Sequence, residues 1–130
     1  EASSTTNPSG IQGVCPAGWH LPSDAEWTEL TNYLGGESVA GGKLKETGTT
    51  HWASPNTGAT NETGFTALPG GLRGLNGTFY NIGSSGYWWS ATELDAASAC
   101  YRHMFNNYSD ASRDGYMDKE VGFSVRCVRD

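Results

Sequence analysis

The clearest pattern of apolar and polar positions lies just after the first twenty residues. Apolar side chains recur there at spacings of three and four, at Trp27, Leu30 and Leu34, which is the stripe of an amphipathic helix. Ser23 followed three residues later by Glu26 forms a capping box at its start, and a pair of glycines follows its last apolar position. The sequence therefore predicts a helix from Asp24 to Leu34, and more weakly a second one from Val39 to Lys45 that contains Gly41 and Gly42.

Between Thr47 and Gly77 the pattern loses its period, and turn-forming residues dominate. Large apolar side chains are spaced through this stretch, at Trp52, Phe65, Leu68 and Leu72. A coil of this length is unusual in a folded domain unless it is packed. The spacing of the apolar side chains indicates an ordered loop.

The last third of the chain alternates short β-prone runs with turn clusters. The runs are residues 78–80, 87–91, 99–105, 112–117 and 123–128, and Asn106 to Asp110 has the composition of a hairpin turn. The pattern predicts an α+β domain with one or two helices, short antiparallel strands and long ordered loops. We assign residues 1–10, which are polar and rich in Ser and Thr, to a flexible N-terminal end, and residues 11–130 to a single domain.

Composition changes this picture in one respect. Gly, Pro, Ser and Gln make up 37 of the 130 residues, a share that warns of disorder, but the chain also has 15 aromatic residues, which disordered segments lack. A small core with many loops fits both facts. The net charge of −6 argues against a nucleic-acid or anionic-membrane partner, and no apolar run is long enough to span a membrane.

The three cysteines, Cys15, Cys100 and Cys127, allow three pairings with one thiol left over. A Cys15–Cys127 bridge would close a loop of more than ~100 residues, which chain-entropy models reward with up to ~4–5 kcal/mol. Cys100 would then be a small buried hydrophobe. Three reduced thiols in a cytosolic protein are the alternative, which the acidic, Trp-rich composition disfavours.

Catalytic and metal motifs are absent from the sequence. His20, His51 and His103 do not lie at pair spacings typical of zinc ligands, and the chain contains neither a nucleophile elbow nor a phosphate-binding glycine loop. An acidic cluster comprises Asp110, Asp114, Asp118 and Glu120; its spacing does not fit an EF-hand, and it is typical of a solvated rim. We therefore expect no metal and no cofactor. Arg73 and Arg126, each in an apolar run, are expected to pair with carboxylates or carbonyls inside the fold.

Four motifs in order carry a family resemblance: Cys15 to Trp27, Gly64 to Arg73, Gly86 to Glu93 and Gly122 to Asp130. Over roughly residues 10 to 130 the chain resembles the Fibrobacter succinogenes major paralogous domain, found in exported Bacteroidetes and Fibrobacter proteins. More distantly, Leu21 to Trp27 and Gly122 to Cys127 are similar to the ends of formylglycine-generating-enzyme-like domains. The resemblance implies a C-type-lectin-like fold with adjacent chain ends, a Cys15–Cys127 disulfide and an extracellular or cell-surface location. This chain differs from the family in one respect: family members usually begin with an extra segment that is missing here.

From these features we expect a non-enzymatic, adhesin-like or receptor-like module that binds a protein or a glycan. In lectin-like folds the later strands and loops build the ligand face, here about Asp95 to Met117, and that stretch is rich in the Tyr, Arg and small polar residues of adaptable binding surfaces. The predicted ligand-binding residues are Tyr101, His103, Asn106, Asn107, Tyr108, Asp110, Arg113 and Tyr116.

Three alternatives remain open at this point. The polar composition of residues 95–116 also resembles the variable proteins of diversity-generating retroelements, which would make this a diversified ligand-binding protein. An enzyme similar to formylglycine-generating enzymes would need a pair of active-site cysteines, and only Cys100 would be unpaired. A structural or pilus-type subunit would fit the missing N-terminal segment.

Overall fold

The helix that follows the capping box is present in the computed structural model, which describes residues 3–130. Helix α1 spans Asp24–Tyr33, with Ser23 as its N-cap. The Ser23 hydroxyl accepts from the Glu26 amide, and the Glu26 carboxylate accepts from the Ser23 amide, so both halves of the capping box form. The buried side chains of α1 include Trp27, which anchors it to the core.

Helix α2 spans Glu37–Leu44 and begins two residues earlier than predicted. Its glycines, which weaken the helix prediction, are required by close backbone contacts. A Cβ atom on Gly41 would lie 2.0 Å from the Asp110 carbonyl oxygen, and one on Gly42 would lie 2.4 Å from the Gly58 carbonyl oxygen. Long-range packing therefore outweighs the low helix propensity of glycine here.

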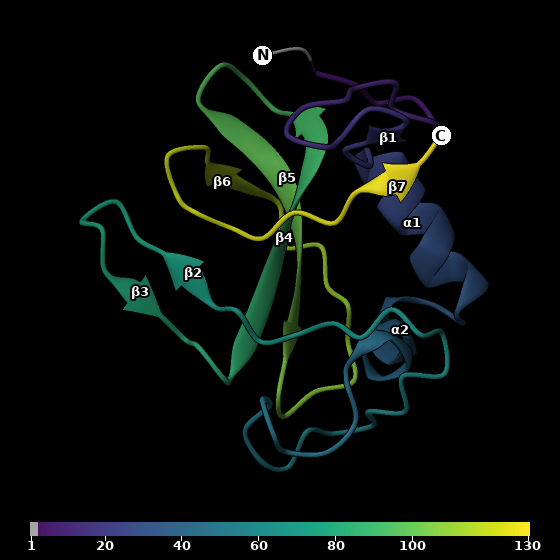
Figure 1. Ribbon diagram of the computed structural model, residues 1–130, viewed down its shortest axis with the longest axis vertical. Helices are drawn as coiled ribbons and strands as arrows, with labels where there is room; N and C mark the ends of the chain where they lie inside the picture. The colour runs from purple at the N-terminus through teal and green to yellow at the C-terminus, as the bar shows by residue number, and fades with distance from the viewer. Residues whose placement is uncertain (1–2) are drawn as a thin grey trace.

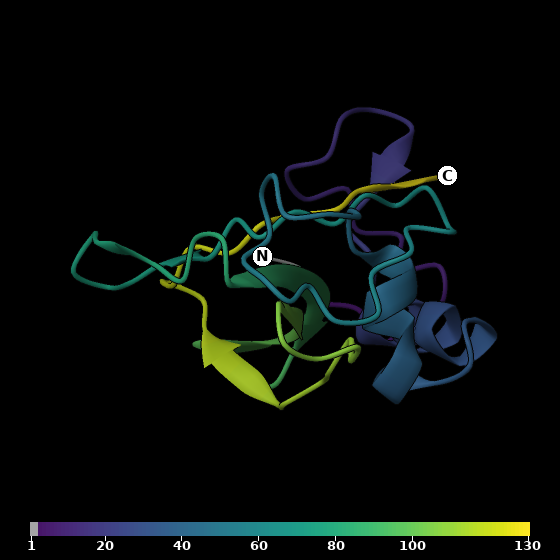
Figure 2. The ribbon, with the colours of Figure 1, turned by 90° about the horizontal axis from the view of Figure 1, so that it is seen from below.

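The strands form three antiparallel groups. A three-stranded sheet has the order β4-β5-β6, and two two-stranded ribbons pair β1 with β7 and β2 with β3. The bounds are β1 (Trp19–His20), β2 (Leu72–Arg73), β3 (Phe79–Tyr80), β4 (Ser85–Glu93), β5 (Ser98–Phe105), β6 (Tyr116–Asp118) and β7 (Val128–Arg129). The predicted α+β architecture with two helices and short antiparallel strands is confirmed. Both helices lie on one side of the central sheet and the β2–β3 hairpin projects from the other (Figures 1 and 2).

Two of the predicted strands are shorter than expected. Between residues 112 and 117, only Tyr116 onward pairs regularly, while Ser112 forms an isolated bridge with His103. Residues 113–115 lie opposite residues 101–102, so this edge of the sheet carries one extra residue, and Gly115 takes a positive φ of 107° there. Between residues 123 and 128, only Val128 is in a strand, and Ser124 bridges Trp88 of β4. The first interruption contains Gly115, and an isolated glycine in a strand-like run is typical of a bulge; the second has no local sequence signal.

The core lies between the central sheet and the helices. Its buried members are Trp27, Leu34, Ala40, Leu44, Trp52, Ala67, Trp88, Met104 and Ala111. Trp52 is fully buried, and its indole N–H donates to the Ala67 carbonyl oxygen at 2.9 Å. The long coil is therefore packed through Trp52 and the partly buried Phe65, as the sequence predicts, whereas Leu68 is exposed.

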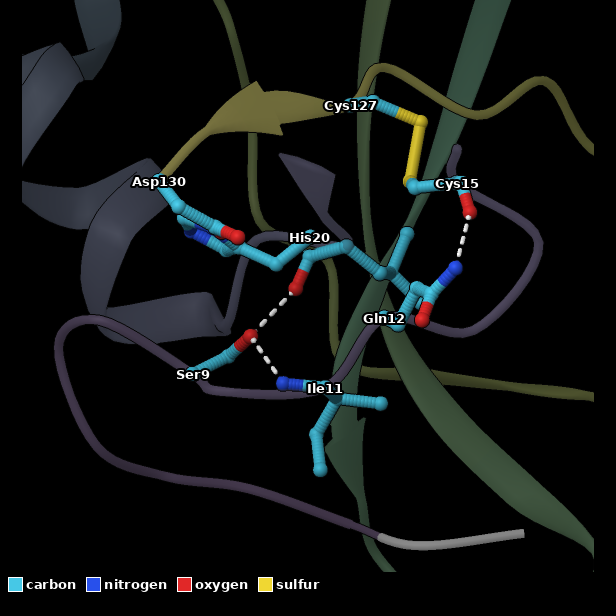
Figure 3. Close-up of a disulfide and its surroundings, with 8 residues drawn as sticks. Ser9, Ile11, Gln12, Cys15, His20, Cys127 and Asp130 are labelled. Atoms are coloured by element: carbon cyan, nitrogen blue, oxygen red, sulfur yellow. Dashed lines mark hydrogen bonds and ion pairs between the residues drawn. A yellow bond between two sulfur atoms is a disulfide. The ribbon is translucent and has the colours of Figure 1, made fainter. Parts of the chain in front are cut away.

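The two ends of the described chain are joined covalently. Cys15 and Cys127 form a disulfide across 112 positions, with their Cα atoms 5.8 Å apart (Figure 3). Residues 3–10, which the sequence assigns to a flexible end, contact the domain: the Ser4 amide donates to the Ala91 carbonyl, and the Ser9 amide donates to the Glu26 carboxylate. Residues 1 and 2 lie outside the described part, and the flexibility of residues 1–10 stays a prediction.

Candidate ligand-binding surface

Alternation along β5 divides its side chains between the two faces of the central sheet. Cys100, Arg102 and Met104 lie on one face and are fully buried. Tyr101 and His103, two of the predicted ligand-binding residues, lie on the other face and are only 8% and 4% exposed. Both faces of β5 are therefore covered.

An aromatic cluster covers the face that carries Tyr101 and His103. The Phe123 ring stacks on Tyr87, with centroids 5.0 Å apart, and lies 5.1 Å from the Tyr101 ring and 4.5 Å from the Trp89 ring. Burial raises the pKa of Tyr101, and the Asp114 charge adds to this effect. Tyr101 belongs to the floor beneath a surface and is not a protruding contact.

His103 links this floor to the edge of the sheet. Its Nε2 lies 3.2 Å from the Asp114 carboxylate. Burial lowers the pKa of His103, while the carboxylates of Asp114, Asp110 and Glu37 act in the opposite direction. The net effect is a pKa below the usual 6.5, and the Asp114 side chain that His103 contacts is mostly exposed.

The predicted residues after β5 lie in a loop whose backbone is tied to its neighbours. The Asn106 amide donates to the Ser84 carbonyl, the Thr57 amide donates to the Asn106 carbonyl, and the Asn106 side chain donates to the Ser54 carbonyl. The Ala111 amide donates to the Glu37 carbonyl. Asn107 is exposed, Asp110 is half-buried, and Tyr108 is 55% exposed with its ring edge-on to Phe105.

The buried Lys45 side chain holds this loop in place, a role that the sequence analysis did not predict. The side chain is fully buried, and Nζ donates to the carbonyl oxygens of Thr57, Phe105 and Tyr108 at 2.9, 2.9 and 2.8 Å. Burial lowers the pKa of Lys45 to about 8, opposed only by the Asp110 charge. A lysine at the end of a short helix is normally exposed to solvent, so no signal in the sequence marks Lys45 as buried.

Arg113 and Tyr116 form a second group on the other face of the sheet. Arg113 Nε lies 2.8 Å from the Asp24 carboxylate, whose charge raises the pKa of Arg113. Tyr116 pairs in register with Cys100. Cys100 is unpaired and fully buried; burial, and then the Asp24 charge, raise the pKa of its thiol. Arg113 and Tyr116 themselves are exposed.

Arg102 fixes the scaffold behind this second group. Its buried guanidinium contacts Glu37, donates to the Thr28 hydroxyl at 2.7 Å and lies 3.4 Å from the Asp24 carboxylate. Asp24 thus bridges the buried Arg102 and the exposed Arg113. Sequence reasoning missed this role, because the capping box accounts for Asp24 only as part of a helix start.

The eight predicted residues are therefore not one patch of equivalent contacts. The exposed ones are Asn107, Tyr108, Arg113 and Tyr116, and we call them, together with the exposed Asp114, the 107–116 surface. Asp114 was not among the predicted contacts. The other predicted residues, Tyr101, His103, Asn106 and Asp110, support this surface from beneath or at its end.

Two further expectations concern charges. Within residues 3–130 no three His, Cys, Asp or Glu side chains gather closely enough to hold a metal ion, and the absence of a metal or cofactor stays a prediction.

The expectation that Arg73 and Arg126 pair inside the fold is wrong: both are exposed and form no ion pair within the described range. The Arg126 guanidinium instead covers the Phe65 ring at 4.1 Å. No described helix has the length and apolarity needed to cross a membrane.

These features define a small, disulfide-closed α+β domain in which a tied loop carries exposed polar and aromatic side chains at a sheet edge. The family model of the Fibrobacter succinogenes major domain matches residues 4–129. The chain belongs to this family. No curated protein and no solved structure matches it.

Proposed function

We propose that this protein is a non-enzymatic binding module of an exported or cell-surface protein, and that it recognises a protein or glycan ligand through the 107–116 surface. The observation that carries the proposal is the contrast between backbone and side chains in this segment. The backbone of residues 106–112 is hydrogen-bonded to several other parts of the chain, at Glu37, Gly42, Lys45, Thr57, Ser84 and His103, while Tyr108 and its neighbour Asn107 project into solvent.

This contrast is what a recognition surface needs. A loop that is already ordered loses little conformational entropy when it binds a partner. Tyr supplies a large contact area with few rotatable bonds, and Asn, Asp and Arg supply hydrogen bonds that adapt to the ligand. Loops held on a rigid scaffold are also where binding residues concentrate.

The state of Cys100 supports a binding module over a formylglycine-generating type of enzyme. A catalytic cysteine must reach its substrate and ionise, because the thiolate is the nucleophile. Cys100 is fully buried and its thiol pKa is raised. The other two cysteines are joined to each other.

Adjacent chain ends, two helices, short antiparallel strands and long packed loops favour a C-type-lectin-like fold for this module. The Cys15–Cys127 bridge favours an oxidising location outside the cytosol.

A glycan and protein array tests the proposal. The native protein is screened beside Tyr108→Ala and Arg113→Ala, which remove one exposed side chain from each group of the 107–116 surface. Removal of a central contact should weaken binding by at least about tenfold. The matched control is Tyr80→Ala, because Tyr80 is 43% exposed on β3 and outside the surface. Equal binding by all four proteins would contradict the proposal.

A further inference from the structure

A hollow elsewhere in the molecule shares no residue with the 107–116 surface. It has a volume of about 370 Å³ and lies between α1, the long coil and the segment that leads into β7. The lining residues that matter here are Trp27, Glu29 and Leu30 of α1, Phe65 of the coil, and Arg126 and Val128. Its volume is within the range of small-ligand sites.

The walls of this hollow are mainly apolar and aromatic. The Phe65 ring lies 5.9 Å from the Trp27 ring, and Leu30 and Phe65 both pack on the core cluster. An apolar group placed here would cover rings that already rest on a fixed core. The hollow therefore suits a ligand with an aromatic or branched aliphatic body.

One lining cation has no carboxylate partner. The Arg126 guanidinium stacks on the Phe65 ring at 4.1 Å and, within residues 3–130, makes no ion pair and no side-chain hydrogen bond. The Lys43, Arg113 and Lys119 cations, by contrast, each lie within 3.2 Å of a carboxylate oxygen. A guanidinium that stacks through its face keeps the N–H donors along its edge available for a carboxylate.

A second lining group lacks a partner as well. Trp27 is 2% exposed, and its indole N–H has no acceptor among the residues that the structure describes. The indole nitrogen itself is covered by protein atoms, so the Trp27 ring contributes an apolar wall to the hollow and its N–H can report on changes there. The accessible donor beside the hollow is the exposed Arg126 guanidinium.

The acidic side chains of the lining are already engaged. The Glu26 carboxylate accepts from His20 and from the Ser9 and Ser23 amides. Glu29 accepts from the Asn7 side chain. Glu26 is thus engaged by three donors, whereas Glu29 has one hydrogen bond and keeps its negative charge, so the Arg126 guanidinium is the lining group that attracts an anion.

We propose that this hollow binds a small carboxylate with an aromatic or branched aliphatic body. The carboxylate pairs with the Arg126 guanidinium, and the body lies against Phe65, Trp27 and Leu30. This site is independent of the proposed recognition through the 107–116 surface, since the two share no side chain.

Nuclear magnetic resonance of the Trp27 indole N–H tests the site, with the resonance assigned from a Trp27→Phe variant. The probes are N-acetylphenylalanine, its neutral C-terminal amide, and phenethylamine as a cation of similar body. We expect the acid to shift the Trp27 resonance with roughly millimolar affinity and the other two probes to bind at least about fivefold more weakly. Arg126→Gln should weaken binding of the acid by about tenfold, and Arg126→Lys by less, because lysine keeps the charge but loses the planar fork.

Arg129→Gln is the matched control, because Arg129 is exposed on the same terminal segment, has no ion pair in the described part of the chain and does not line the hollow. It should bind the acid as the native protein does. Unchanged thermal unfolding of Arg126→Gln shows that its fold is intact. Equal binding of acid and amide, tighter binding of phenethylamine, an equal loss in Arg129→Gln, or no shift with the acid would each overturn the proposal. None of these results bears on the glycan and protein array.

Discussion

The two ends of this molecule are held together by different chemistry. At the end where the chain termini meet, Cys15 is bonded to Cys127, and His20 lies between Glu26 and Asp130, each 2.7 Å away. We call this group the terminal clamp. At the C-terminal end of α2, a helix in the lower part of Figure 1, Lys45 donates to three backbone carbonyls, and we call this group the lysine clamp.

The two clamps differ in the groups that contact the cation and in the direction of its pKa shift. In the terminal clamp a cation meets carboxylates, and its pKa is raised, first by the hydrogen bond to Glu26 and then by the one to Asp130. In the lysine clamp a cation meets only neutral oxygens, and burial lowers its pKa to about 8. Carbonyls can be supplied by any backbone, so a buried lysine can hold a loop whatever side chains the loop exposes. Tyr108 of the 107–116 surface is held in this way through its backbone carbonyl, which leaves its side chain exposed.

Removal of the disulfide should have the largest effect and would test how far the terminal clamp depends on its covalent bond. The Cys15→Ser/Cys127→Ser double variant opens a loop across 112 positions, for which chain-entropy models give a loss of about 4–5 kcal/mol. Urea unfolding of the two proteins measures it. A reducing agent should destabilise the native protein but leave the double variant unchanged. A loss below about 1 kcal/mol would show that the noncovalent contacts of the termini suffice.

Lys45→Met should have the next largest effect and breaks the other clamp. The substitution keeps the apolar stem but leaves three carbonyls without their donor, at about 1 kcal/mol or more each. We expect a loss of about 3 kcal/mol in urea unfolding and faster amide exchange in residues 106–111.

The control for this variant is Lys43→Met on the same helix, because Lys43 is partly exposed and pairs with the solvent-exposed Glu62. A change within about 0.5 kcal/mol is expected there. If Lys45→Met cost no more than Lys43→Met, the lysine clamp would contribute nothing to stability.

The comparison also shows which parts of the structure the sequence could predict. Helix α1 depends on a capping box and an apolar stripe, both local, and its start at Asp24 is as predicted. Lys45 could not be recognised, because its carbonyl partners are 12 to 63 positions away. What a side chain contacts across such distances is set by the packed fold, and residue type carries no trace of it.

The candidate site shows the same limit. Tyr108 and Arg113 were predicted to be ligand contacts from their residue types, and both are exposed. Tyr101 and His103 were predicted from alternation along β5, which shows that two faces exist but not that Phe123 covers one of them. Asp114 was passed over because an acidic residue in a loop is ordinary, and its contact with His103 depends on the extra residue at the sheet edge.

The smallest predicted effect, the pH dependence of stability, separates the two clamps most sharply. His20 has a pKa raised above its usual 6.5, so its contribution is complete below pH 6.5 and is lost as the pH rises through the raised value. Lys45 behaves oppositely. Its pKa of about 8 is below the usual 10.5, so the unfolded chain binds the proton more tightly between these values, and stability rises with pH across that interval.

The native protein should therefore lose stability as the pH rises through the raised His20 value and gain part of it back between about pH 8 and 10.5. Urea unfolding across this range measures the profile. His20→Gln should remove the loss and keep the gain, whereas Lys45→Met should keep the loss and remove the gain. His51→Gln is the control, because His51 is an exposed histidine paired with Glu46, where solvent screens the interaction. Because the raised pKa values of the Cys100 thiol and of Tyr101 lower stability in the same interval, the deciding quantity is the difference between the native and Lys45→Met profiles. A difference that does not rise between about pH 8 and 10.5 would contradict a charged, buried Lys45, and the two clamps would then differ in position but not in chemistry.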